Sequence, residues 1–143
     1  MRQMRVWLVL GLVGAALIAI LGPASSAVGF FSRGLSLDVK VQSPAVLVGK
    51  GAAVNQPLYV TCTSRNADLY VQVTQRVGSA IAQGFAYQNV TCAGGIQTVN
   101  VTVTASGGKA FKKGTAVVSA QIYGCLTICG SESDTETIAV SQK

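Results

Sequence analysis

The residues that could carry out chemistry are few in this sequence. It has no histidine, which excludes nucleophilic sites of the Ser-His or Cys-His type and the common catalytic zinc sites. Three of its five carboxylates occupy alternate positions near the C-terminus, Glu132, Asp134 and Glu136. They could share one face of a strand and hold a calcium ion, but charged clusters are usually solvated surface. We therefore expect no enzymatic activity, no catalytic residue, no bound metal and no cofactor.

The cysteines are the other reactive side chains. There are four, Cys62, Cys92, Cys125 and Cys129, and an even number in an exported chain indicates disulfides. Their spacing matches neither a thioredoxin-type redox pair nor a zinc ribbon. Three pairings are compatible with the number alone.

Export is indicated by the N-terminus. Two arginines among the first five residues precede sixteen uncharged residues, and small residues at 24–27 predict cleavage after Ala27. A retained membrane anchor is the alternative, but the apolar run is shorter than the roughly 20 residues that a bilayer core requires. We expect a secreted, extracellular protein without a stable membrane anchor, with a signal peptide at 1–27, a short lead-in at 28–34 and one domain at 35–143.

The part after the lead-in alternates between apolar and polar residues nearly throughout, which is the pattern of half-buried strands. No helical periodicity is seen. The pattern predicts an all-β fold, an immunoglobulin-like antiparallel β-sandwich of about seven strands, with a small barrel as the alternative. The expected strands are 35–41, 58–62, 69–74, 81–91, 99–104, 118–123 and 138–140.

The sandwich topology favours one disulfide pairing over the others. It brings the ends of the second and sixth strands and the start of the fifth to one pole, so that Cys62 can pair with Cys92 across neighbouring strands. Cys125 has the outward parity of Tyr123, which disfavours a buried link to Cys62. We predict Cys62 with Cys92 and Cys125 with Cys129. The second bridge closes a tight loop that either staples a turn or shapes a surface.

An outward-facing surface is the strongest candidate for ligand binding. The third and sixth strands are neighbours in the expected topology, so their outward tyrosines and amides come together, and the apolar tip of the tight loop lies just beyond. Such side chains combine apolar area with directional polar groups, although cross-strand pairing that only stabilises the sheet is the alternative. The candidate residues are Tyr70, Gln72, Gln121, Tyr123, Leu126 and Ile128.

The charge of the chain is mildly basic. Without Arg2 and Arg5, nine basic and five acidic residues remain, a formal charge of +4. The basic residues are scattered and aromatics do not interleave with them, so we expect no nucleic-acid partner. The loop at 109–113 could contact an anionic wall polymer or a membrane surface, or serve only to keep the protein soluble.

Short motifs suggest two relatives. The strand end at 59–62, the turn at 91–95 and the last strand after paired cysteines resemble the small, functionally uncharacterised immunoglobulin-like proteins that actinobacteria secrete. Residues 114–141, with a strand ending in Cys125, a small disulfide loop and a final strand, are more weakly similar to neocarzinostatin-type apoproteins. That second resemblance implies a ligand pocket on the outer face of the larger sheet, whereas the separation of Cys62 from Cys92 departs from that family's pattern.

These observations favour a secreted, non-enzymatic binding or interaction module. Its expected partner is an extracellular protein, a cell-wall polymer or a small molecule. The alternatives are an inhibitor of an extracellular protease acting through the loop from Cys125 to Cys129, and a protein that sequesters a small molecule. An enzyme on a sandwich scaffold would be indicated by a metal at residues 132–136.

Overall fold

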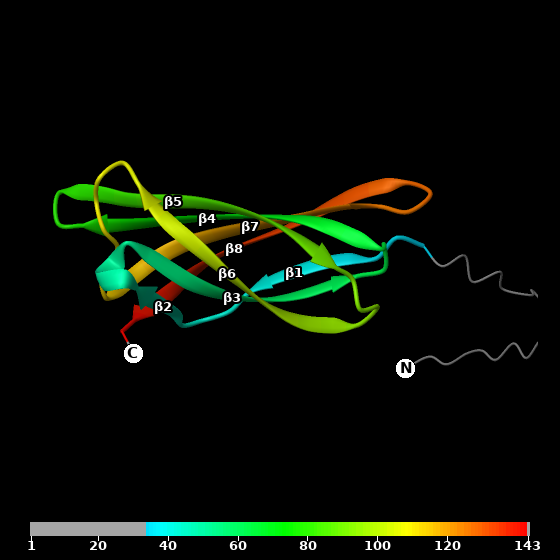
Figure 1. Ribbon diagram of the computed structural model, residues 1–143, viewed down its shortest axis with the longest axis horizontal. Coiled ribbons are helices and arrows are strands. Elements are labelled where there is room, and N and C mark those ends of the chain that lie inside the picture. The colour runs from blue at the N-terminus through cyan, green and yellow to red at the C-terminus, as the bar shows by residue number, and fades with distance from the viewer. Residues whose placement is uncertain (1–33, 143) are drawn as a thin grey trace, which may run out of the picture. The chain divides into compact units, whose positions relative to one another are not determined.

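The computed structural model describes residues 34–142, and most of them lie in strands (Figure 1). The predicted signal peptide and all but the last residue of the lead-in lie outside the described residues. Within residues 34–142 no helix is long and apolar enough to cross a bilayer. The prediction of an all-β protein is therefore confirmed for this part of the chain.

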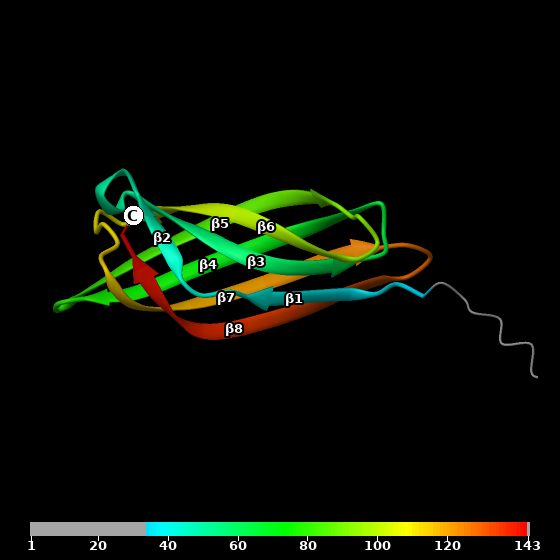
Figure 2. The ribbon, with the colours of Figure 1, turned by 90° about the horizontal axis from the view of Figure 1, so that it is seen from below.

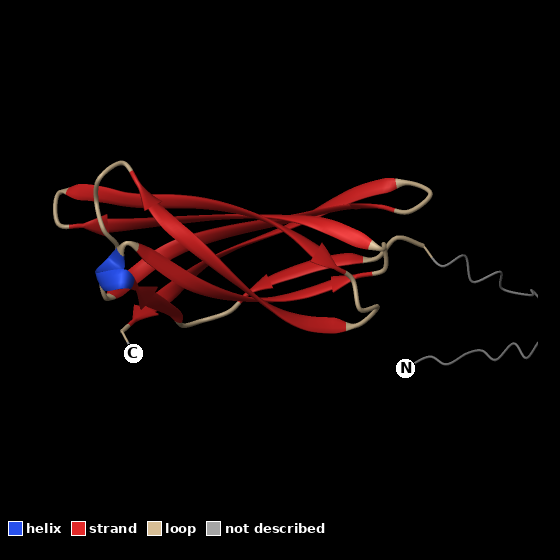
Figure 3. Cartoon of the chain, viewed as in Figure 1, coloured by secondary structure: helices blue, strands red, loops and turns tan. Residues whose placement is uncertain are grey.

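Eight strands and one turn of 3-10 helix make up the described part of the chain (Figure 3). They are β1 (Leu37–Val41), β2 (Ala45–Val48), η1 (Gly49–Gly51), β3 (Ala53–Cys62), β4 (Asn66–Val77), β5 (Ala80–Thr91), β6 (Ile96–Ser106), β7 (Gly114–Cys125) and β8 (Cys129–Ser141).

Seven of these strands form a closed, mixed β-barrel. Hydrogen bonding runs from β3 through β6, β5, β4, β7, β8 and β2 back to β3, and β1 is added to the edge of β3. All pairings are antiparallel except that of β2 with β8. The structure is thus not a clear immunoglobulin-like sandwich, because short pairings join what a sandwich would leave as separate sheets. The small barrel considered as the alternative is the better description.

The barrel closes where β5 meets β6, through only two residue pairs, Gln83 with Ser106 and Gly84 with Ala105. Gly84 makes this approach possible. A Cβ atom at this position would lie 2.3 Å from the carbonyl oxygen of Thr104, far inside van der Waals contact. A glycine within a strand often marks such a close passage of another backbone, so this pairing depends on the missing side chain.

The barrel interior contains the apolar residues that the alternation predicted to face inward. Each contributing strand buries every second residue, as its pleat requires. One polar side chain, Gln56, is also fully buried, and its Nε2 donates to the carbonyl oxygens of Gln42 and Pro57. Residues with no exposed surface include Leu58, Val60, Leu69, Val71, Val73, Val103, Val118, Ala120 and Ile122.

Most strands are longer than predicted, with β3 beginning at Ala53 instead of Leu58, and β2 and β8 differ most. β2 was not expected, because its four residues follow a proline and precede a Gly-Lys-Gly turn; it pairs with the start of β3 across that turn and with Val140 and Ser141 of β8. The last strand begins at Cys129 instead of near Ile138. In its first half even Glu132 and Glu136, which have the same parity as the buried Ile138 and Val140, are exposed, so burial imposes no apolar alternation there.

The loops collect at two opposite ends of the barrel (Figures 1 and 2). The end that we call the disulfide end carries the β3–β4, β5–β6 and β7–β8 connections, including all four cysteines. The other, which we call the lysine end, carries η1, the β4–β5 turn and the long β6–β7 connection.

Candidate functional site

An exposed aromatic cluster lies on the outer surface of β4 and β5. Antiparallel pairing places Tyr70 directly opposite Tyr87, and Phe85 lies diagonally beside them. The Tyr70 ring centroid is 5.1 Å from that of Tyr87 and 6.2 Å from that of Phe85, in tilted arrangements. Phe85 is 60% exposed and Tyr87 54%, so these large side chains contribute little to the core.

Polar side chains surround this cluster on the same outer surface. They come from β4, β5 and β7, because outward positions of neighbouring antiparallel strands lie side by side. Together these residues form what we call the aromatic face. Its members are Asp68, Tyr70, Gln72, Phe85, Tyr87, Asn89, Ser119, Gln121 and Tyr123.

Hydrogen bonds fix the orientation of Tyr87. Its hydroxyl donates to Oδ1 of Asp68 at 2.7 Å, and Nδ2 of Asn89 donates to the same oxygen at 2.8 Å. The bond from Tyr87, followed by that from Asn89, lowers the pKa of Asp68 below its ordinary value. The same bond raises the pKa of Tyr87, because it favours the protonated phenol. At neutral pH the face therefore carries one negative charge beside a ring held in place.

The aromatic face is open and has only a shallow hollow. Tyr70, Gln72, Phe85, Ser119 and Gln121 line a pocket of about 210 Å³. Sites that enclose a drug-sized molecule typically measure about 300–1,000 Å³. The geometry suits a ligand that lies along the sheet better than one that is enclosed.

The structure brings four of the six predicted ligand residues onto this face. Tyr70 lies opposite Gln121, Gln72 lies opposite Ser119, and Tyr123 lies opposite Asp68. All four point outward. The other two predicted residues, Leu126 and Ile128, lie at the tip of the β7–β8 hairpin.

The contribution of β5 to this face was not predicted. A strand was expected at 81–91, but it was not paired with that of Tyr70. The turn at Gly78, with a φ of +63°, was the available signal, because a two-residue turn between two alternating segments predicts a hairpin. A hairpin at that position brings the two tyrosines opposite each other.

Both predicted disulfides are present. Cys62 is bonded to Cys92 with a Cα–Cα distance of 5.3 Å, and Cys125 to Cys129 with 4.0 Å. One detail differs, since Cys92 lies in the β5–β6 connection and not within the strand that follows it. The first bridge has a fully buried partner in Cys62, whereas both cysteines of the second are exposed.

The second bridge closes a curled three-residue loop. Cys125 and Cys129 face each other in the β7–β8 register, and the N–H of Leu126 donates to the carbonyl oxygen of Ile128 at 2.9 Å. Leu126 is 46% exposed and Ile128 70%. The hydroxyl of Tyr123 lies 3.3 Å from Sγ of Cys125, so the disulfide adjoins the end of the aromatic face.

The three C-terminal carboxylates share one side of β8, along the seam where β8 runs beside β1 (Figure 2). Oδ2 of Asp134 accepts the backbone N–H of Val41 at 2.8 Å and so satisfies a donor of β1. Within the described residues, no three acidic or cysteine side chains are grouped closely enough to hold a metal ion.

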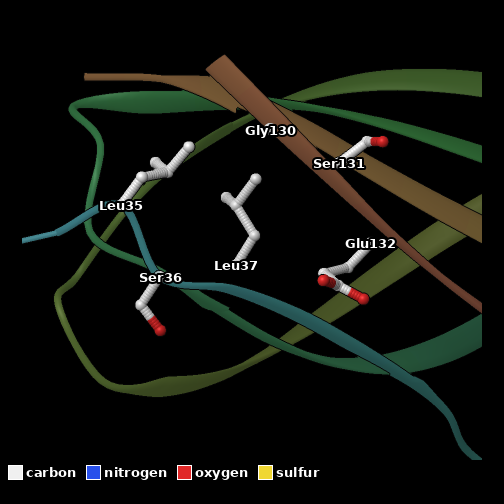
Figure 4. A pocket seen from close by; sticks show the side chains of 6 residues that line it. All are labelled: Leu35, Ser36, Leu37, Gly130, Ser131 and Glu132. Carbon is white, nitrogen blue, oxygen red and sulfur yellow. The ribbon is translucent and has the colours of Figure 1, made fainter. Parts of the chain in front are cut away.

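A second hollow lies at this seam, near the disulfide end. Leu35 and Leu37 extend toward Gly130 of β8, and Glu132 borders a pocket of about 290 Å³ (Figure 4). Ser36 points away from Gly130. The leucines pack closely over Gly130, where an added Cβ would lie 3.2 Å from Leu35. This contact closes one side of the hollow, while Ser131 and Glu132 make the rest of its border polar.

Comparison of the chain with models of known protein families and with curated protein sequences gives no match.

Proposed function

We propose that the protein is a secreted, non-enzymatic binding module whose aromatic face holds an extended carbohydrate. The observation that carries this proposal is the exposed cluster of Tyr70, Phe85 and Tyr87, bordered by a hydrogen-bonded carboxylate and by amides. Exposed aromatic side chains of this size are expected at interaction surfaces. Secretion is supported by the pattern of residues 1–27 and by two disulfides, which persist in oxidising compartments.

The chemistry of the aromatic face matches the two sides of a sugar ring. The apolar C–H faces of a pyranose stack on aromatic rings, and its hydroxyls donate to and accept from carboxylates and amides. Asp68 uses Oδ1 for both of its protein donors, which leaves Oδ2 for a ligand hydroxyl. Gln72 and Gln121 offer donors and acceptors beside the Tyr70 ring. The open geometry favours a polysaccharide over a free sugar.

The immunoglobulin-like relationship forms part of the same proposal. Its support is the unequal length of the pairings. β3 is joined to β6, β4 to β5 and to β7, and β7 to β8 over long registers, whereas the contacts that close the barrel involve two or three residue pairs. We infer a flattened barrel derived from two sheets, with the aromatic face on the outside of the larger one.

The proposal is tested by pull-down with insoluble polysaccharides and with cell-wall preparations. Tyr70→Ala and Phe85→Ala are expected to weaken retention at least about tenfold, since burying one such ring contributes roughly 1.5–3 kcal/mol. Tyr59→Ala is the matched control, because Tyr59 is similarly exposed, at 46%, but lies on β3 away from the aromatic face. Equal losses in all three variants, or no retention of the wild type on any polysaccharide, would refute the proposal.

A second candidate function is inhibition of an extracellular protease by the loop that Cys125 and Cys129 close. The exposed Leu126 and Ile128 favour it, because a protease pocket accepts such side chains. The curled backbone supports it less well, since proteases bind extended segments and the loop spans only three residues. A panel of secreted proteases assayed with excess protein tests this idea, and full activity throughout would end it.

A further inference from the structure

The lysine end carries most of the positive charge of residues 34–142. Five of the seven basic residues within 34–142 lie there, on η1, at the end of β4 and in the β6–β7 loop. The described segments that form this end, 45–52, 75–80, 105–114 and 138–142, contain no carboxylate side chain. Among the described residues, the one ion pair within 4 Å joins Lys40 to Asp38, which belong to β1. The five residues are Lys50, Arg76, Lys109, Lys112 and Lys113.

The β6–β7 loop that carries three of these lysines is firmly held. Phe111 is 2% exposed, and its N–H donates to the carbonyl oxygen of Gly51 at 2.8 Å. The buried side chain of Gln75 binds Lys112 twice, since Nε2 donates to the Lys112 carbonyl oxygen and Oε1 accepts the Lys112 N–H, each at 2.7 Å. A loop whose only task is solubility does not require a buried glutamine as a clamp.

Lys50 is brought to the same place from a different segment. It lies in η1 with a left-handed φ of +58°, a region that residues with a side chain seldom occupy. Next to it, a Cβ on Gly51 would lie 2.1 Å from the carbonyl oxygen of Phe111, so η1 and the loop are in direct backbone contact. The two segments therefore present their lysines as one rigid group.

These lysines border a pocket of about 420 Å³. Lys50, Lys112 and Lys113 supply ammonium groups, and Leu47 and Phe111 contribute its apolar lining. Like charges held together repel one another, and a bound anion relieves that repulsion. Lysine commonly binds phosphate groups in proteins, through the point charge of its ammonium group. Because the loop is already ordered, binding an anion there costs little conformational entropy.

We propose that the lysine end is a binding site for the phosphates of an anionic polymer. Repeating phosphates would occupy the pocket and reach Lys109 and Arg76, which extend the positive surface beyond it. A membrane surface fits less well, because the aromatic side chain of this loop, Phe111, is buried and is not available to enter a bilayer. The site lies at one end of the barrel and does not depend on the aromatic face.

The test uses long-chain inorganic polyphosphate as the probe, with binding followed by fluorescence anisotropy over a series of salt concentrations. The variant Lys112→Gln/Lys113→Gln is expected to bind at least tenfold more weakly. For this variant, the slope of log affinity against log salt concentration should be smaller in magnitude by about two, roughly one for each phosphate contact removed. Lys50→Gln, from the other segment, should also weaken binding.

Lys40→Gln/Arg65→Gln is the matched control, because it removes the same charge from exposed positions away from the lysine end. Equal weakening by this control would overturn the site and leave only a net-charge effect. Orthophosphate binding as tightly as polyphosphate would overturn the polymer assignment, as would binding to phosphatidylglycerol vesicles without binding to polyphosphate. No binding of the wild type to polyphosphate at low salt would refute the proposal outright. Tyr70→Ala should retain polyphosphate binding, which separates this site from the aromatic face.

Discussion

Removal of the two disulfides should destabilise the protein to different extents, and the difference follows from their positions in the chain. A disulfide acts mainly by restricting the unfolded chain, so its contribution grows with the logarithm of the loop that it closes. Cys62 and Cys92 are separated by 30 residues and contribute about 3.6 kcal/mol at 25 °C. Cys125 and Cys129 are separated by 4 and contribute about 1.9 kcal/mol.

Packing adds to this difference. Cys62 has no exposed surface, so replacing it with alanine also leaves a small cavity in the core. Cys125 and Cys129 are exposed, and their replacement with serine leaves none. We therefore expect the double variant Cys62→Ala/Cys92→Ala to lose at least about 1.8 kcal/mol more than Cys125→Ser/Cys129→Ser.

Urea unfolding of the oxidised wild type and both double variants measures the effect. With a slope of about 1–3 kcal/mol per molar urea, the two midpoints should differ by roughly 0.6–1.8 M or more. The wild type unfolded in the presence of a strong thiol reductant should be less stable than either variant. An equal loss in the two variants, or a greater loss for the Cys125 and Cys129 pair, would show that loop length does not govern these contributions.

Three further predictions concern single residues. Gly84→Ala should destabilise the protein by about 1–3 kcal/mol, because the Cβ of the new alanine would overlap the Thr104 carbonyl oxygen where the barrel closes. An unchanged urea midpoint would contradict this close contact. Phe111→Ala should lower the free energy of unfolding by about 3–5 kcal/mol, because a fully buried aromatic ring is removed, and the same urea experiment measures this. A loss below 1 kcal/mol, about that of a single methylene, would mean that this ring does not anchor the loop. Tyr87→Phe should raise the pKa of Asp68 toward its ordinary value, since the largest cause of the lowering is removed. The pKa of Asp68 is lower in the folded protein than in the unfolded chain. The ionised Asp68 side chain therefore stabilises the fold at a pH above its pKa in the unfolded chain, and this stabilisation is lost as the pH falls through its pKa in the folded protein. The stability difference between wild type and Tyr87→Phe should therefore shrink in acid, and an Asp68 pKa that is the same in both proteins by NMR titration would refute the role of the hydrogen bond.

The alternation of apolar and polar residues within each segment was sufficient to predict most strands of the barrel. Strands such as β6, with Val99, Val101 and Val103 inward, were predictable because a pleated strand turns successive side chains to opposite sides whatever its partners are. The same parity rule placed Tyr70, Gln121 and Tyr123 on the outer surface. The disulfide pairing followed from the neighbouring strands of the expected topology, from the parity of Cys125 and from the small number of possible pairs.

The closure of the barrel and the composition of its candidate sites were decided only by the tertiary structure. Nothing near Gly84 in the sequence shows that the backbone at Thr104 passes over it. Lys50 and Lys112 are far apart in the chain, and only the buried contact of Phe111 with Gly51 brings them to one pocket. Alternation reports which side of a strand is buried, but the choice of neighbouring strand depends on hydrogen bonds and packing between distant segments, for which a single segment carries no information.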